Sequence, residues 1–211
     1  GTGIYDVKIS GNYIGADATG NTALANGQVN PVYGKGIYVQ NKVKDVQIGT
    51  NSNGTSDLLE RNVIAGNYSN GIHFWNNTGT ASLMQNIIVA GNYIGVGANG
   101  MTALGNRAGV RIESATNIRI GADDNGTRDE VERNVIANNL EEVATTVKGG
   151  VVVSNIGTVA ADKIRISQNS FYNNVGLPID LNDDGVTVNN GALSASFPNT
   201  ELDYPVLTDY D

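Results

Sequence analysis

Short runs in which apolar and polar residues alternate recur along the whole chain, separated by stretches rich in Gly and Asn. Two clear examples are Gly36–Asn41, which reads Gly-Ile-Tyr-Val-Gln-Asn, and Gly109–Glu113, which reads Gly-Val-Arg-Ile-Glu. A period of two is the pattern of a β-strand with one buried and one exposed face. The chain is therefore predicted to consist mainly of short strands joined by turns and loops.

Longer segments also repeat. The segment Glu60–Asn67 returns almost unchanged as Glu132–Asn139, 72 residues later, and Gly11–Gly15 returns as Gly91–Gly95, 80 residues later. Repeats at long spacing are typical of solenoids, in which each unit completes its core only by stacking on its neighbours.

The alternating runs divide the chain into circuits of about three strands each. The circuits begin at Gly36, Gly71, Gly109, Gly150 and Gly176, at intervals of 35, 38, 41 and 26 residues. Stacked circuits would pair as parallel strands about 4.8 Å apart. The inward side chains should then form columns, namely Ile37/Val39, Ile72/Phe74, Val110/Ile112, Val151/Val153 and Leu177/Ile179.

Asparagine is frequent at the predicted strand ends. Two explanations are open: Asn tolerates the left-handed conformation of a sharp corner, and stacked Asn amides can bond to one another along a ladder. The residues concerned are Asn12, Asn41, Asn62, Asn67, Asn76, Asn92, Asn134, Asn139 and Asn169.

Composition narrows the class of protein. The chain has 211 residues, 27 of them Gly and none Cys, with a net charge of −8. This charge argues against nucleic acid and anionic membrane surfaces as partners, and no apolar run is long enough to span a bilayer. Because the first residue is Gly, we interpret the chain as an excised or mature piece of a larger protein with further domains.

Three segments resemble right-handed parallel β-helix repeat proteins of the bacterial secreted and cell-surface type: residues 11–24, 61–67 and 176–187. Tyr204–Thr208 is similar to the exit of that module into a following domain. The resemblance implies an all-β, right-handed parallel β-helix of about five to six coils over residues 1–187. Residues 188–211 would form a C-terminal cap or exit segment.

A ligand-binding face is predicted on the strands that open the circuits. Their outward residues include Tyr38, Gln40, His73, Trp75, Arg111 and Glu113, followed by Val152/Ser154 and Pro178/Asp180. Aromatic rings beside hydrogen-bonding groups suit a sugar, which has apolar faces and polar edges. The alternative is that these residues are ordinary solvent-facing side chains.

We expect no required cofactor, with calcium as the candidate ion. Clustered oxygen ligands on turns are offered by Asp123, Asp124, Asp183 and Asp184. Side chains of this kind also bond their own turns, so a structural role is the alternative. The same applies to the repeated pairs Glu60-Arg61 and Glu132-Arg133, and to Asp57 and Asp129, which we interpret as links between coils or at strand entries.

The resemblance implies an extracellular or cell-surface module with a scaffold, adhesive or glycan-binding role. A polysaccharide or cell-surface glycan is the expected partner. The wider superfamily also contains pectate lyases, polygalacturonases and uronan epimerases, so a polysaccharide lyase, glycoside hydrolase or epimerase is the alternative. We favour a non-enzymatic role because no site collects paired carboxylates in a recognisable arrangement. A flat ice- or mineral-binding face is disfavoured because no outward Thr column is present.

Overall fold

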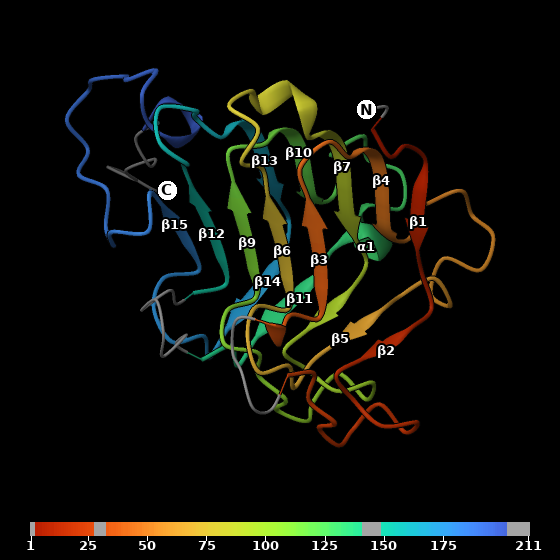
Figure 1. The fold of residues 1–211 in the computed structure, drawn as a ribbon. Helices are drawn as coiled ribbons and strands as arrows, with labels where there is room; N and C mark the ends of the chain where they lie inside the picture. Colours follow the sequence, from red (N-terminus) through yellow and green to blue (C-terminus); the bar gives the residue numbers. More distant parts are fainter. Residues whose placement is uncertain (1–2, 28–32, 141–148, 202–211) are drawn as a thin grey trace, which may run out of the picture.

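The computed structural model describes residues 3–27, 33–140 and 149–201, and within them the fold is nearly all β. Three parallel five-stranded sheets surround one core (Figure 1). Sheet I holds β1 (Val7–Ile9), β4 (Lys44–Gly49), β7 (Gln85–Ala90), β10 (Thr116–Gly121) and β13 (Asp162–Ser167). Sheet II holds β2 (Tyr13–Ile14), β5 (Val63–Ile64), β8 (Tyr93–Ile94), β11 (Val135–Ala137) and β14 (Ser170–Tyr172). Sheet III holds β3 (Ile37–Gln40), β6 (Ile72–Trp75), β9 (Val110–Glu113), β12 (Val151–Ser154) and β15 (Ile179–Leu181).

The chain visits the three sheets in turn, and each strand pairs in parallel with the strand three places later. The described residues thus form five stacked coils, an arrangement consistent with the predicted parallel β-helix. The helical elements η2 (Ala81–Leu83), α1 (Asp129–Glu132) and η3 (Pro198–Glu201) are each only three or four residues long. No helix among the described residues has the length and apolar character needed to cross a membrane.

The core consists of columns of aliphatic side chains. In sheet III, Ile37 pairs in register with Ile72, Ile72 with Val110, and Val110 with Val151, as predicted. In sheet I, one column contains Val7, Val46, Ile87, Ile118 and Ile164. The central members of both columns are almost fully buried. Stacking along the coil axis is what removes these side chains from water, because a single coil could not enclose them.

The last coil departs from the predicted register. Val151 pairs with Ile179 and Val153 with Leu181, so Leu177 is not in the inward column as expected. The coil opens at Pro178, whose carbonyl accepts from the Val151 amide, and not at Gly176. Proline lacks the amide proton that an interior strand position needs, so it lies immediately before the strand. The outward position beside Val152 therefore belongs to Asp180, not to Pro178.

Two ladders of asparagine side chains run along the coil axis. In each ladder the side-chain amide of one Asn donates to the carboxamide oxygen of the next, at 2.9–3.1 Å. One ladder joins Asn12, Asn62, Asn92, Asn134 and Asn169. The other joins Asn26, Asn67, Asn106, Asn139 and Asn174. Of the nine Asn residues considered from the sequence, only Asn41 has a positive φ, so ladder formation accounts for most of them and corner geometry does not.

Among the repeated charged residues, Arg61 and Asp57 contact other coils, whereas Glu132 pairs within its own coil. Arg61 donates to the Gly91 carbonyl at 3.0 Å and lies over the Tyr93 ring, while Glu132 forms an ion pair with Arg119 at 3.0 Å. Asp57 is buried and pairs with Arg128 of a later loop. These contacts fit the structural role predicted for the repeats.

The C-terminal described segment lies against the edge of sheet I. In η3, the Asn199 amide donates to the Ala161 carbonyl at 2.8 Å, and its side chain exchanges hydrogen bonds with the Ile164 backbone at 2.8 and 2.9 Å. The bonds to Ile164 satisfy backbone groups of β13, which is one of the two edge strands of sheet I. The predicted exit segment Tyr204–Thr208 lies outside the described residues.

Candidate functional site

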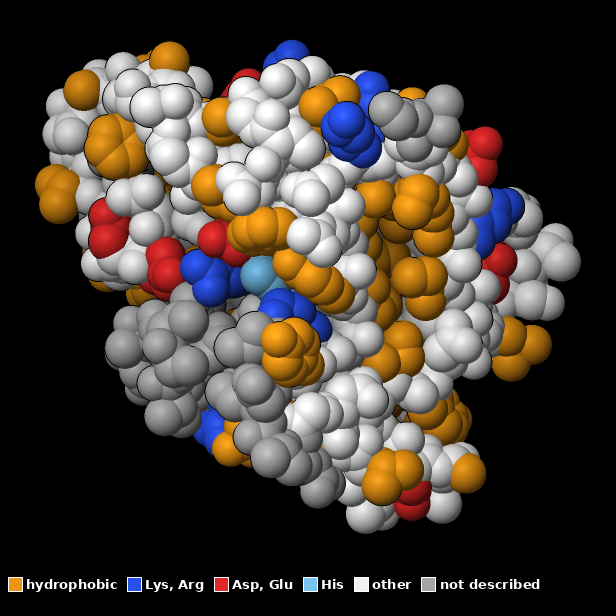
Figure 2. All heavy atoms as spheres, viewed as in Figure 1, with side chains coloured by type: hydrophobic (Ala, Val, Ile, Leu, Met, Phe, Trp, Pro, Cys, Tyr) orange, Lys and Arg blue, Asp and Glu red, His pale blue; other side chains and the backbone are white. Residues whose placement is uncertain are grey.

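The candidate site lies on the outer face of sheet III. Strand register places Tyr38, His73, Arg111, Val152 and Asp180 in one outward column. Gln40, Trp75, Glu113 and Ser154 form the adjacent column. All six residues predicted for this face therefore share it, and Asp180 joins them because of the shift in the last coil. Figure 2 shows the only histidine flanked by basic, acidic and hydrophobic side chains.

His73 and Glu113 form the centre of the site. Nε2 of His73 lies 2.5 Å from Oε2 of Glu113, and the two side chains are only 8% and 12% exposed. Burial lowers the pKa of His73 below its ordinary value of 6.5. The hydrogen bond to Glu113 opposes this shift, whereas the charges of Arg111 and Lys35 add to it. A neutral imidazole then donates from Nε2 to the carboxylate, which leaves Nδ1 with the lone pair.

Nδ1 of His73 is buried and has no hydrogen-bond partner among the described residues. The same holds for Oγ of Ser154, on the strand two places away in sheet III. Buried polar atoms are usually satisfied, so an unpartnered lone pair on an oriented imidazole calls for explanation. Chemically, it is a hydrogen-bond acceptor or a proton acceptor held in place by a carboxylate.

Charged groups continue the site toward the C-terminal coils. Arg111 lies 3.2 Å from Glu113 and 3.8 Å from Asp183, measured between its Nη2 atom and the carboxylate oxygens. Asp180 is buried and accepts hydrogen bonds from the Gly185 amide at 3.2 and 3.3 Å. Burial raises the pKa of Asp180, with a smaller contribution from the charge of Asp184, so protonation becomes easier than for an exposed aspartate.

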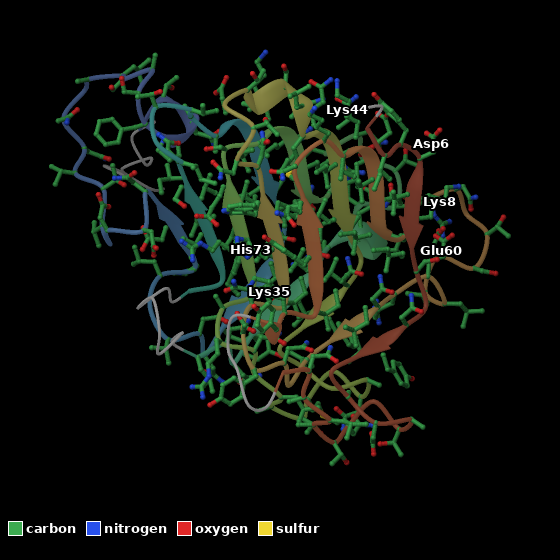
Figure 3. The ribbon with its side chains drawn as sticks, viewed as in Figure 1. Asp6, Lys8, Lys35, Lys44, Glu60 and His73 are labelled. Carbon is green, nitrogen blue, oxygen red and sulfur yellow. The ribbon has the colours of Figure 1, made fainter. Side chains whose placement is uncertain are left out.

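The side of the site toward the N-terminal coils contains aromatic side chains and is more exposed than His73 and Glu113. The Tyr38 ring is tilted by 42° against the His73 ring, with the ring centroids 5.3 Å apart. Nζ of Lys35 lies 5.0 Å from the Tyr38 centroid, and Figure 3 places Lys35 and His73 on the same face. Burial raises the pKa of the Tyr38 hydroxyl, and the Glu113 charge contributes. Trp75 is half-buried, whereas Gln40 is exposed.

The alternation pattern found the members of the face but not their burial. The solvent-facing alternative is wrong for His73, which is 6% exposed. The solvent-facing alternative fits Tyr38 better, because this side chain is 46% exposed. Lys35 was missed because it precedes the strand and follows no alternation. A cation three residues before a half-exposed aromatic residue was the available signal.

The four candidate calcium ligands do not form one cluster. Asp123 lies with Asp129 and Glu132 in a trio whose ligand atoms are within 4.8 Å of one another. Oε2 of Glu132 is already engaged, because it accepts from Arg119 and from the Asp123 amide. Asp129 and Glu132 were identified in the sequence only as repeated residues. The match of Asp123–Glu132 to the earlier loop Asn51–Glu60 could have brought them together.

Asp124 points to other partners. Its carboxylate accepts hydrogen bonds from Ser167, Gln168 and Arg165. These bonds lower the pKa of Asp124 to about 2, and the bond from Ser167 makes the largest contribution. Asp183 faces Arg111, and Asp184 accepts from the Asn182 side chain at 2.9 Å. Calcium binding by these residues stays a prediction.

No family model matches the chain, and no solved structure matches it.

Proposed function

We propose that the chain is an extracellular or cell-surface module, a right-handed parallel β-helix, that binds a saccharide on the outer face of sheet III. The resemblance of three sequence segments to bacterial β-helix repeat proteins supports the setting and the handedness. The five-coil stack of parallel strands is consistent with that architecture.

The binding role is supported by one observation: a part-exposed aromatic ring lies next to polar side chains whose orientation is fixed by their mutual contacts. Tyr38 is 46% exposed and lies 5.3 Å, between centroids, from the His73 ring. His73 in turn is bonded to Glu113, and Glu113 to Arg111. A sugar ring can place its apolar face on Tyr38 while its hydroxyls bond to charged groups whose positions are already fixed. Pre-positioned groups lower the entropic cost of binding.

The test is a glycan array followed by calorimetry on any ligand found. Tyr38→Ala and Trp75→Ala should each weaken binding by about tenfold or more, corresponding to about 1.4 kcal/mol per tenfold. Tyr172→Ala is the matched control, because Tyr172 is a part-exposed aromatic residue on sheet II. Unchanged binding in both sheet III variants would remove this face from consideration.

A polysaccharide-modifying enzyme is the second candidate. It is favoured by one observation: an imidazole oriented by Glu113 shares the face with Asp180, whose pKa is raised. A base and an acid with shifted pKa values are what cleavage or epimerisation of a polysaccharide requires.

This candidate is tested with a panel of uronic-acid and neutral polysaccharides, measuring new reducing ends and the absorbance of unsaturated uronate. Activity that disappears in both His73→Asn and Asp180→Asn would establish it. A panel without turnover by the native chain would leave only the binding role.

A further inference from the structure

Two loops of the chain have nearly the same sequence at the same place in their coils. Residues 53–57 read Asn-Gly-Thr-Ser-Asp, and residues 125–129 read Asn-Gly-Thr-Arg-Asp. Each loop connects a strand of sheet I to a strand of sheet II, the first after β4 and the second after β10. The proposed site on sheet III uses neither loop.

Asn125 and Gly126 form a reactive pair in the second loop. An Asn side chain that precedes Gly can react with its own backbone, because the missing Cβ lets the Gly amide nitrogen approach the carboxamide carbon. The Thr127 amide donates to Oδ1 of Asn125 at 2.6 Å. This bond polarises the carboxamide and stabilises negative charge that develops on Oδ1 during an attack on the carbon. Asn125 is also exposed, so water has access to the pair.

Asp129 is in the position of a base for this pair. Its Oδ2 atom accepts a hydrogen bond from the Gly126 amide at 3.3 Å, so it lies next to the proton that must leave before the nitrogen attacks. Oδ1 of the same carboxylate is buried and has no hydrogen-bond partner among the described residues. Gln168, an uncharged donor, also bonds to Oδ2 at 3.0 Å. The carboxylate therefore has an oxygen available to take up a proton.

The Asn-Gly pair at Asn99 has the same turn but a different acceptor. The Met101 amide donates to Oδ1 of Asn99 at 2.9 Å, and Gly100, like Gly126, has a positive φ. The Gly100 amide, however, donates to the Gly97 carbonyl at 2.9 Å, and a backbone carbonyl is too weak a base to remove the proton. Asn99 is exposed as well, so this pair is an internal reference that isolates the effect of the carboxylate.

The first loop is an intermediate case. The Gly54 amide donates to Oδ2 of Asp57 at 3.2 Å, in the same way as in the second loop. Arg128 donates to this same oxygen at 2.8 Å from its Nε atom. The guanidinium competes with the amide proton for Oδ2, because hydrogen bonds between charged groups are the stronger ones. Asn53 should therefore react more slowly than Asn125.

We propose that Asn125 is a site of self-catalysed deamidation, with Asp129 as the general base. Asp129 takes the proton of the Gly126 amide, the nitrogen forms a bond to Cγ of Asn125, and the bond between Cγ and Nδ2 breaks. The leaving Nδ2 group takes the proton from Asp129 and departs as ammonia. Water then opens the resulting succinimide at either of its carbonyl groups, which gives Asp or isoaspartate. This reaction does not depend on saccharide binding at sheet III.

The product changes a loop that connects two coils. Either product adds a negative charge beside Asp123 and Asp124. Isoaspartate also adds one carbon to the main chain of a loop that Asp124 ties to Arg165 and Ser167 of the next coil. The modification thus falls where the last two coils are tied together.

Peptide mapping by mass spectrometry tests the proposal on the unaltered chain. The full chain is incubated at neutral pH, and the deamidated fractions at Asn125, Asn99 and Asn53 are followed over time. General-base catalysis contributes about 10²–10⁴-fold, so Asn125 should deamidate at least about tenfold faster than Asn99. In water enriched in heavy oxygen, the product at Asn125 should gain one heavy oxygen atom.

Two controls separate the effect of the base from that of the local sequence. Asp129→Asn keeps an oxygen that accepts from the Gly126 amide but removes the base. It should slow deamidation of Asn125 about tenfold or more and leave that of Asn99 unchanged. In the chain unfolded by urea, Asn125 and Asn99 should react at similar rates, because only the fold holds Asp129 at the Gly126 amide. The comparison of Asn125 with Asn99 needs no variant, so it decides the question even where Asp129→Asn does not fold.

Each outcome decides for or against the proposed base. Faster deamidation of Asn125 that is slowed both by Asp129→Asn and by unfolding supports it. Equal rates at Asn125 and Asn99 in the folded chain, or a higher rate at Asn53 than at Asn125, would overturn it. An unchanged rate at Asn125 in a folded Asp129→Asn chain would do the same, as would a preference for Asn125 that persists in urea.

Discussion

His73 shows at the residue scale how the stack creates an environment that a single strand could not. Three side chains from the two flanking coils, Tyr38 on β3 and Arg111 and Glu113 on β9, surround an imidazole on β6. Because its folded-state pKa lies below 6.5, neutral His73 contributes stability that is present above pH 6.5. That contribution is lost as the pH falls through the folded-state pKa.

The first prediction concerns this titration. His73 is the only histidine, so its imidazole resonances can be followed by NMR without assignment ambiguity. The folded chain should give a pKa below 6.5, and the free energy of unfolding of His73→Gln should depend less on pH below pH 6.5 than that of the native chain. A measured pKa above 6.5 would mean that the bond to Glu113 outweighs burial.

A second prediction at this scale concerns the asparagine ladders. Asn92 is fully buried and donates to Asn134 at 3.0 Å and to the Ile48 carbonyl at 2.9 Å. Asn92→Ala leaves these acceptors without their partner and should cost about 2–4 kcal/mol in urea unfolding. Asn77→Ala, at an exposed position, should change stability by less than about 0.5 kcal/mol. Similar values for the two variants would contradict a stabilising ladder.

At the scale of the strand, the sequence predicted most of the register and failed at a definite place. Alternation located Ile37, Ile72, Val110 and Val151 in one column because each follows a glycine that opens a coil. It failed in the last coil because Pro178, not Gly176, occupies the opening position. The members of the candidate site followed from the same alternation. Burial of His73 and the position of Lys35 did not, because both depend on contacts between coils.

Strand ends supply the third prediction. Gly121, the last residue of β10, has φ +98°, and a Cβ added there would lie 2.0 Å from the Ser167 carbonyl oxygen of the next coil. Gly79 also has a positive φ, +76°, but no atom lies within 4 Å of the added Cβ. Gly79→Ala should therefore cost about 1–2 kcal/mol from backbone conformation alone. Gly121→Ala should cost clearly more, and equal costs in thermal or urea unfolding would contradict the close approach of the coils.

The whole molecule behaves as a stack whose ends need protection. At the edge strand β13, the Asn199 side chain of η3 accepts from the Ile164 amide and donates to the Ile164 carbonyl. Exposed strand edges promote aggregation. The fourth prediction follows from the cap role expected for residues 188–211. Because a chain ending at residue 187 would leave the edge uncovered, it should be less soluble than the full chain. Light scattering at matched concentration measures this. Equal solubility would show that the tail does not protect the edge.

The central claim is that residues about 40 positions apart in the sequence lie side by side in successive coils. Cross-linking tests this most directly, because the chain contains no Cys and introduced thiols have no background. Gln47 and Ile88 are register partners on β4 and β7 and both point outward. The variant carrying Cys at both positions should cross-link rapidly with a short bifunctional thiol reagent, as judged by mass spectrometry of the digest. A variant with Cys at Gln47 and Arg133, which lies beside sheet II, should not. Absence of the Gln47–Ile88 cross-link, or equal cross-linking of the control pair, would contradict the stacked arrangement.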